Sequence, residues 1–152
     1  TLLEVGPGHQ RTGRAVTVPN SALLSGAVVN ESFMERYVLH VVKVPIDLRQ
    51  DDWEAAEKAL LEAGREVCAE YLEPARAFMD ALSKKHGLPN LTVAPRVHLA
   101  LASPNEAHLL LRVPSPVRER GRIEQAILRR YLSRYKRRAE QDTAGSAPAH
   151  WP

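Results

Sequence analysis

The sequence predicts an α+β fold, with a small N-terminal β unit followed by a larger unit that packs helices against a sheet. Residues 1–32 hold short apolar runs separated by turn residues. Two later stretches, 53–85 and 123–135, carry apolar residues at helical spacing, and two alternating runs lie between them. The composition, 44% hydrophobic and 26% charged, is that of a folded globular protein and excludes wholesale disorder.

The β unit is predicted to occupy residues 1–32. Strands are expected at residues 1–5 and 15–18, because Gly6-Pro7-Gly8 and Thr12-Gly13 supply turn conformations between them. Pro19 cannot donate a ladder hydrogen bond and is expected to end the second strand. Asn20 or Ser21 can then cap a single helical turn, which leads into a further strand.

The second unit is predicted to span residues 33–138 and to begin with a strand at Tyr37–Val44 that Pro45 ends. Asp51 is expected to cap the next helix, with Glu54 three residues later as in a capping box. Residues at three- or four-residue spacing form its predicted buried stripe. These are Trp53, Ala56, Leu60, Gly64, Val67 and Tyr71.

Pro74 interrupts this stripe, which predicts either a kinked helix or two helices that meet at Glu73. The helical pattern resumes from Ala75 to Lys85 with Phe78, Met79 and Leu82, and Gly87-Leu88-Pro89-Asn90 is expected to stop it.

A hairpin is predicted at residues 96–102 and 107–113, with its turn at Ser103-Pro104-Asn105-Glu106. Its apolar face is expected to carry Val97, Leu99 and Leu101 on the first strand and Leu109, Leu111 and Val113 on the second.

Pro114-Ser115-Pro116 should close the hairpin, with Pro116 as the first residue of a last helix. That helix has a predicted inner stripe of Ile123, Ala126, Ile127, Tyr131 and Tyr135. The order strand, helix, strand, strand, helix is that of a ferredoxin-like α/β sandwich without its last strand. Residues 139–152 have no periodicity and are expected to form a disordered tail.

The last helix is strongly basic, although the whole chain has a net charge of only +3. Between Arg118 and Arg138 there are nine basic and two acidic residues, which leaves the rest of the chain mildly acidic. Such a helix could bind nucleic acid, but its apolar stripe places the arginines on a solvated outer face. Nucleic acid is disfavoured as a partner because only Tyr37 on the three predicted strands could stack a base.

Catalytic and metal chemistry find little support in the sequence. His40, His98 and His108 lie on predicted strands, but a symmetric hairpin offsets His98 and His108 by two residues, about 7 Å. We therefore name no metal ligand, no cofactor-binding residue and no catalytic residue. The lone Cys68 cannot form an internal disulfide. Glu54, Glu57, Glu62, Glu66 and Glu70 are interpreted as solvated partners of Lys58 and Arg65, so we predict a non-enzyme.

Residues 13–32 resemble a strand, Pro-Asn-Ser turn and strand found in the small-conductance mechanosensitive channel family, at the end of the β domain in its cytoplasmic region. The resemblance rests on the spacing of small, apolar and Asn residues around the turn. They are Gly13, Val16, Val18, Pro19, Asn20, Ser21, Leu23, Gly26 and Asn30.

The resemblance implies that residues 1–32 are the C-terminal part of that β domain and that residues 33–138 form the wall of a hollow cytoplasmic cage. It also implies a homo-oligomer, usually a heptamer, that conducts inorganic ions through the cell membrane under osmotic stress. The nine motif residues would then make interdomain and subunit contacts.

No run in the sequence is long and apolar enough to span a membrane, and the chain opens on Thr1, so we expect a missing N-terminal transmembrane part. The family often closes its cage with a further strand, which the tail does not resemble, so we do not expect this fragment to form the ring on its own. The alternative interpretation is a ferredoxin-like regulatory or nucleic-acid-binding module.

Overall fold

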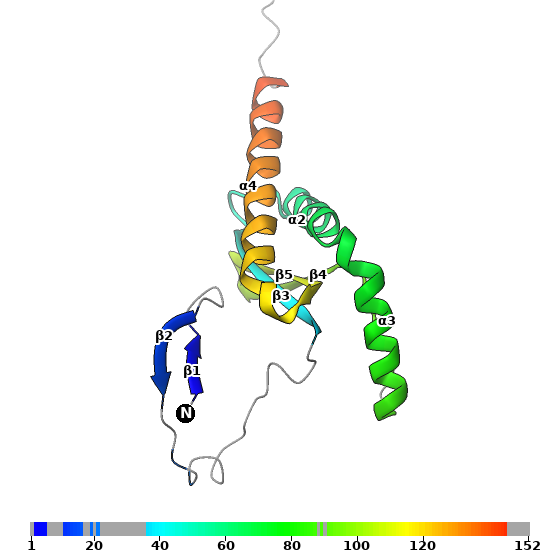
Figure 1. Cartoon of the computed structure of the whole chain (residues 1–152). Coiled ribbons are helices and arrows are strands. Elements are labelled where there is room, and N and C mark those ends of the chain that lie inside the picture. The colour runs from blue at the N-terminus through cyan, green and yellow to red at the C-terminus, as the bar shows by residue number, and fades with distance from the viewer. Residues whose placement is uncertain are drawn as a thin grey trace, which may run out of the picture.

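A computed structural model of the chain describes residues 2–5, 11–16, 19, 21, 36–87, 89 and 91–145, with side chains for 19, 21, 36–87, 89 and 91–135. The described part is α+β, with a three-stranded antiparallel sheet, three helices and a separate two-stranded hairpin (Figure 1). Its elements follow one another as β1 (Leu2–Val5), β2 (Arg11–Val16), β3 (Tyr37–Asp47), α2 (Trp53–Val67), α3 (Ala69–His86), β4 (Arg96–Ser103), β5 (Glu106–Pro116), the 3₁₀ turn η2 (Val117–Glu119) and α4 (Arg120–Gly145).

The N-terminal hairpin pairs β1 with β2 in antiparallel register, with Leu2 opposite Val16 and Val5 opposite Arg11. The predicted first strand is therefore confirmed. The second begins earlier than predicted, because β2 starts at Arg11 and includes Thr12 and Gly13, which were expected to form a turn. The register between the two strands is irregular in this part of β2. The strand predicted after the Pro-Asn-Ser turn lies outside the described residues.

The three-stranded sheet has the order β3-β5-β4, so β5 is central and pairs with both neighbours. Val42 of β3 and Val97 of β4 both lie opposite Leu111, and this register continues along the strands. β3 does not end at Pro45 as predicted but continues to Asp47. A proline is tolerated there because β3 is an edge strand, which leaves one side of its backbone without ladder partners.

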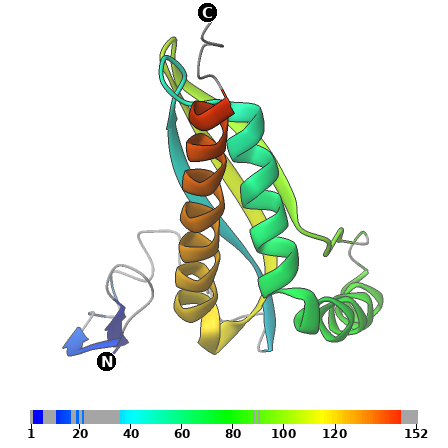
Figure 2. The same ribbon diagram turned by 90° about the horizontal axis from the view of Figure 1, so that it is seen from above.

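Helices α2 and α4 lie side by side over one face of the sheet, which we call the inner face (Figure 2). Every second strand residue faces them, so this face holds the main hydrophobic core. The fully buried strand residues at its centre are Val42, Leu109, Leu111 and Val113. From the helices come Ala56, Ala59, Leu60, Ala63, Ile123, Ile127 and Tyr131.

The predicted stripes are mostly confirmed, with two exceptions at the margin of the core. Trp53 is 37% exposed in the first turn of α2, and Leu101 is 74% exposed on β4. Leu101 lies on the inner face opposite Ala107, but β4 is an edge strand and the helices pack mainly over its neighbours. The two-residue alternation therefore predicted correctly that Leu101 lies on the inner face, but it did not predict how exposed Leu101 is there.

The start of α2 differs by one residue from the prediction, because its N-cap is Asp52 and not Asp51. The Asp52 carboxylate accepts a hydrogen bond from the Ala55 backbone N–H at 3.1 Å. Asp51 instead accepts one from the backbone N–H of Asp47 at 3.0 Å and one from the Tyr135 hydroxyl at 3.1 Å. Asp51 thus links the end of β3 to α4.

The helical segment breaks at Cys68, not at Glu73 as predicted. Pro74 lies inside α3, six positions into the helix, so its missing N–H removes one bond near the beginning of that helix. Residue 74 lies beyond the first four N–H groups that have no intrahelical partner, so the proline costs this helix one bond and does not end it. Gly87 ends α3 in a left-handed conformation with φ of 62°, as predicted from the glycine.

α3 packs against the opposite, outer face of the sheet at the beginning of β3. A second apolar cluster forms there around Ala75 and Met79 of α3 and Val93. Tyr37 and Leu39 of β3 contact this cluster, and the rings of Tyr37 and Phe78 lie 5.9 Å apart. α3 therefore covers only one end of the outer face.

β5 runs through Pro114 and Ser115 to Pro116, so these residues extend the hairpin instead of closing it. The helix predicted to begin at Pro116 starts at Arg120, after η2. Because Pro114 and Ser115 pair with Leu39 and Val38, the strand is held by the ladder beyond the point where the sequence suggests a turn. α4 continues to Gly145, which makes the first part of the predicted 139–152 tail helical.

Within the described residues, no helix combines the length and apolar character needed to cross a membrane.

Candidate functional site

The residues of the sequence motif are only partly described. Gly13 and Val16 lie on β2, and Pro19 and Ser21 are exposed. The remaining motif residues, Val18, Asn20, Leu23, Gly26 and Asn30, lie outside the described residues. The predicted roles of the motif residues in interdomain and subunit contacts stay predictions.

The outer face of the sheet is open beyond the end covered by α3, and the polar side chains in its next three rows are two arginines, a lysine and two histidines. The strand register arranges them in rows across β3, β5 and β4. One row is Val41, Arg112 and Arg96; the next is Lys43, Leu110 and His98. A third row holds Pro45, His108 and Ala100. We call the surface formed by Lys43, Arg96, His98, His108 and Arg112 the cationic face.

The cationic face is accessible to solvent. Lys43, Arg96 and His98 are exposed, Val41 beside them is 48% exposed, and Arg112 is half-buried. Arg112 is held by a 3.0 Å hydrogen bond from Nη2 to the backbone carbonyl of Thr92. Because the other guanidinium donors remain available, this bond orients Arg112 without consuming its capacity to bind an anion.

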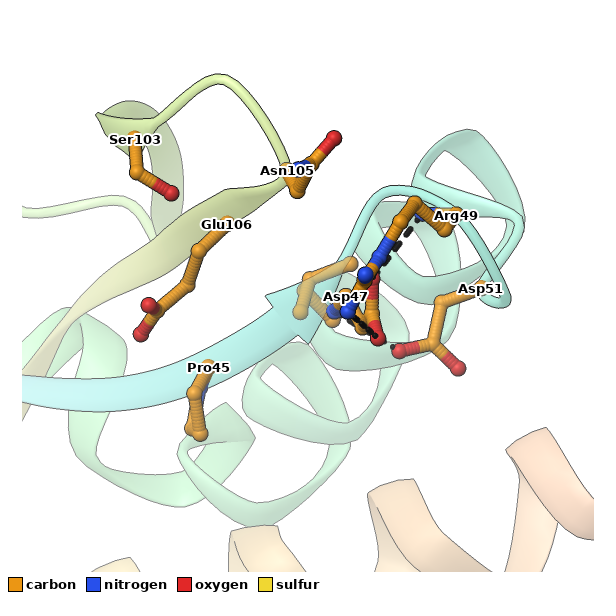
Figure 3. Close-up of a pocket in the computed structure, with 8 residues that line it drawn as sticks. Pro45, Asp47, Arg49, Asp51, Ser103, Asn105 and Glu106 are labelled. Carbon is orange, nitrogen blue, oxygen red and sulfur yellow. Dashed lines mark hydrogen bonds and ion pairs between the residues drawn. The ribbon is translucent and has the colours of Figure 1, made fainter.

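An acidic hollow of about 590 Å³ lies where the sheet ends, between the β3–α2 connection and the β4–β5 turn (Figure 3). Its carboxylates are Asp47, Asp51 and Glu106, with Arg49 beside Asp47. Arg49 donates to Asp47 from Nε at 3.1 Å and from its own backbone N–H at 3.0 Å. The side-chain bond from Arg49 is the main cause that lowers the pKa of Asp47.

The carboxylates of this hollow already have structural partners. Asp51 ties β3 to α4, and Asp47 holds Arg49. Ser103 and Asn105 complete the lining, and Figure 3 shows Glu106 on the strand side of the hollow. Among the residues that the structure describes, no group of three or more His, Cys, Asp or Glu side chains could hold a metal ion. The hollow is therefore polar and acidic, with no built metal site.

The seam between α2 and α4 joins acidic to basic residues. Arg134 forms ion pairs with Glu62 and Glu66, and Arg130 pairs with Glu66. A hydrogen bond from Arg134 is the main cause that lowers the pKa of Glu66. Lys58 and Arg65 were the predicted partners of these glutamates. In the structure, Glu62 and Glu66 instead form ion pairs with arginines of α4. Part of the basic helix is thus committed to packing within the chain.

His40 and Glu124 link the sheet to α4. His40 is buried on the inner face of β3, and its Nε2 lies 2.7 Å from a carboxylate oxygen of Glu124. His98 and His108 lie on the outer face, with His98 opposite Leu110 and His108 opposite Ala100. This confirms their predicted two-residue offset. His108 lies 3.4 Å from Glu106.

Cys68 is buried at the break between α2 and α3, where desolvation raises the pKa of its thiol to about 11. Because the raised folded-state pKa lies above the ordinary 9.0, its contribution to stability is complete below about pH 9 and is lost as the pH rises toward 11. The thiolate is the reactive form, so raising the thiol pKa from 9.0 to about 11 by itself lowers the thiolate population about a hundredfold at pH 8.

We expect Cys68 in the folded chain to react with an aromatic disulfide reagent at pH 8 at least about 100-fold more slowly than in the guanidinium-unfolded chain. The single cysteine makes the released chromophore a direct measure. A Cys68→Ala, Ala81→Cys chain is the control, since Ala81 is exposed on α3 and should react quickly in both states. Equal rates for Cys68 in both states would contradict its burial.

The cationic face is the candidate functional feature that the sequence interpretation missed. The alternation that placed Leu109 and Leu111 inside also places Arg112 outside, and the predicted hairpin register brings Arg96 opposite it. The sequence therefore contained the signal for this pair. The neighbouring Lys43 could not be placed, because the pairing of β3 with β5 is a long-range contact.

A search of known protein families, curated proteins and solved structures gave no match to this chain.

Proposed function

We infer that this chain is the cytoplasmic part of a mechanosensitive ion channel of the small-conductance type. The observation that carries the proposal is the sequence from Gly13 to Ser32, which predicts a strand, a turn at Pro19-Asn20-Ser21 and a further strand. An α+β unit follows this segment directly, as the family's domain order requires.

The strand order supports the finer assignment of the α+β unit as a ferredoxin-like sandwich without its last strand. In that arrangement the third strand lies between the first and second, antiparallel to both, as β5 lies between β3 and β4. α4 would be the second helix of the sandwich. α2 would be the first helix, and α3, which the break at Cys68 separates from it, would be an addition on the opposite face of the sheet.

In this proposal the function is mechanical and steric, and no bond is made or broken. The N-terminal β part would link the membrane pore to the α+β unit, which would form the cage wall and subunit contacts. The parent protein would be a homo-oligomer, a heptamer in the full-length form, in the cell membrane with this portion in the cytoplasm. Charge at the openings of the cage would bias which inorganic ions pass.

The alternative is a regulatory or nucleic-acid-binding module, and the cationic face is the observation that favours it. Arg96, Arg112 and Lys43 could contact phosphates. However, Tyr37, the aromatic residue of β3, contacts the cluster under α3, and no aromatic residue lies in the three rows of the open face. A surface of this kind lacks the stacking platforms that bind single-stranded RNA.

The test is patch-clamp recording of the full-length parent protein in membranes from cells that lack their own such channels. We expect stepwise currents that appear as suction raises membrane tension. Asn20→Ala should reduce the current at a given tension, because it removes one of the two side chains, Asn20 and Ser21, that can cap the predicted turn of the motif. Asn105→Ala, in the exposed β4–β5 turn, is the matched control and should leave the current unchanged.

Absence of current up to membrane rupture, with the protein shown to be in the membrane, would overturn the channel proposal. Currents that respond equally to Asn20→Ala and Asn105→Ala would contradict the role given to the motif. Tight, salt-sensitive binding of single-stranded RNA by the chain would instead favour the alternative.

A further inference from the structure

We propose that the cationic face is a binding site for a small, multivalent phosphate, centred on Arg96 and Arg112. This inference does not depend on the channel proposal, since it rests on the outer face of the β3-β5-β4 sheet alone. The ligand class is a soluble compound with two or three linked phosphate groups.

Arg96 and Arg112 are directly opposite one another across the β4–β5 pair. Side chains in this relation have Cβ atoms about 4.5–5.5 Å apart, and like charges there destabilise a sheet. Within the described part of the chain, no carboxylate forms an ion pair with Arg96, Arg112 or Lys43. A bound anion would remove this uncompensated repulsion, because two guanidinium groups can each present paired N–H donors to phosphate oxygens.

Two further polar side chains, Lys43 and His98, lie in the row next to the arginines and complete the proposed site. Lys43 and His98 flank Leu110 in that row, one strand away on either side. Adjacent strands are about 4.8 Å apart and successive residues on one face are separated by about 7 Å, so the four polar side chains surround an area of roughly 10 by 7 Å. An area of this size matches a short chain of phosphate groups, with the two arginines at one end and Lys43 and His98 at the other.

The surroundings of the cationic face limit the size of the ligand. On one side, α3 and its apolar cluster around Met79 cover Leu39 and Tyr37. Beyond the third row, Asp47 lies opposite Glu106 and both carboxylates belong to the acidic hollow. A flat anionic membrane or a long nucleic acid would have to approach these carboxylates as well, which is unfavourable. A small phosphate compound can occupy the cationic rows without reaching them.

The proposal is tested with inorganic triphosphate as the probe, titrated into the full chain at low ionic strength and followed by calorimetry and by ¹H–¹⁵N spectra. We expect the largest shifts on β4 and β5 around Arg96 and Arg112. Arg96→Gln and Arg112→Gln should each weaken binding about tenfold, because each removes charge-assisted hydrogen bonds. Arg96→Lys should weaken it less, since the charge remains but the paired donors are lost.

Arg129→Gln is the matched control, because it removes the same charge from an exposed position on α4. We expect it to change the affinity less than twofold. Raising the salt concentration should weaken wild-type binding, as expected for exposed charges. Far-ultraviolet circular dichroism and the unfolding midpoint of each variant establish that the fold is retained, so that a loss of binding can be assigned to the removed side chain.

Two further ligands distinguish a site for small phosphate compounds from a membrane-binding or nucleic-acid-binding surface. Vesicles of anionic phospholipid and a single-stranded oligonucleotide are offered to the same variants. Binding of triphosphate that depends on Arg96 and Arg112 supports the proposal. Equal effects of Arg129→Gln and Arg112→Gln, no binding of triphosphate at millimolar concentration, or binding to vesicles or the oligonucleotide without binding to triphosphate would overturn it.

Discussion

Leu111→Ala is expected to lower the free energy of unfolding by about 3–4 kcal/mol, the usual range for a leucine removed from a rigid core. Leu111 is fully buried at the centre of β5, between Val42 and Val97 on the neighbouring strands. It also fills the space above Gly64 of α2, because a Cβ placed on Gly64 would lie 2.8 Å from a Leu111 methyl carbon. Truncation would leave a cavity that neither the sheet nor α2 can close.

Denaturant unfolding followed by circular dichroism measures this loss, with Leu132→Ala as the matched control. Leu132 is 52% exposed on α4, so the same substitution there should cost less than about 0.5 kcal/mol. Similar losses for the two variants would contradict the position of Leu111 in the core.

Because α2 lies so close to β5, the effect of Gly64→Ala on the free energy of unfolding should change sign when Leu111 is truncated. In the wild-type chain, Gly64→Ala should be neutral or destabilising, since overpacking offsets the roughly 1 kcal/mol that alanine contributes to a helix. In the Leu111→Ala background the added methyl group enters the cavity, and the same change should stabilise the chain by about 1 kcal/mol. The same sign in both backgrounds would show that Gly64 and Leu111 are not in contact.

Glu124→Ala is expected to lower the free energy of unfolding by about 2 kcal/mol, because it leaves the buried ring of His40 without its carboxylate partner. His40 is 9% exposed and Glu124 is 24% exposed, so solvent can compensate the lost bond only in part. A double-mutant cycle with His40→Ala should give a coupling energy of about 1–2 kcal/mol.

The exposed pair of Arg76 and Glu73 on α3 is the matched control for this cycle. Its side chains are 48% and 73% exposed, and pairs of that kind contribute little. A coupling energy for His40 and Glu124 no larger than that of the control pair would mean that their contact does not hold α4 to the sheet.

The inner face of the sheet was largely predictable from the sequence, because its signals are local. Alternation placed Leu109, Leu111 and Val113 on the inner face, and the four-residue spacing of Ile123, Ile127 and Tyr131 predicted the buried side of α4. Gly87 ended its helix as expected, since a left-handed residue is most easily a glycine.

Where proline was read as a boundary, the sequence interpretation was wrong three times. Pro45 lies within β3, Pro74 within α3 and Pro116 within β5. Proline removes one N–H group, and the cost depends on whether that group had a partner. An edge strand leaves such groups free on one side, whereas within α3 the proline costs one helix bond that the packing of the helix has to offset. The sequence around a proline does not reveal either situation.

The sequence by itself determined the α+β class, the order of most elements and which side of each element is apolar, since these follow from repeats of two or nearly four residues. It also supplied the motif from Gly13 to Asn30 on which the channel proposal rests. Only the tertiary structure decided that the α2 glutamates form ion pairs with arginines of α4. It also decided that Lys43 lies near Arg96 and Arg112 on the outer face, and that Leu101 stays exposed. These features depend on contacts between residues far apart in the chain, and strand order and helix placement fix such contacts where local periodicity cannot.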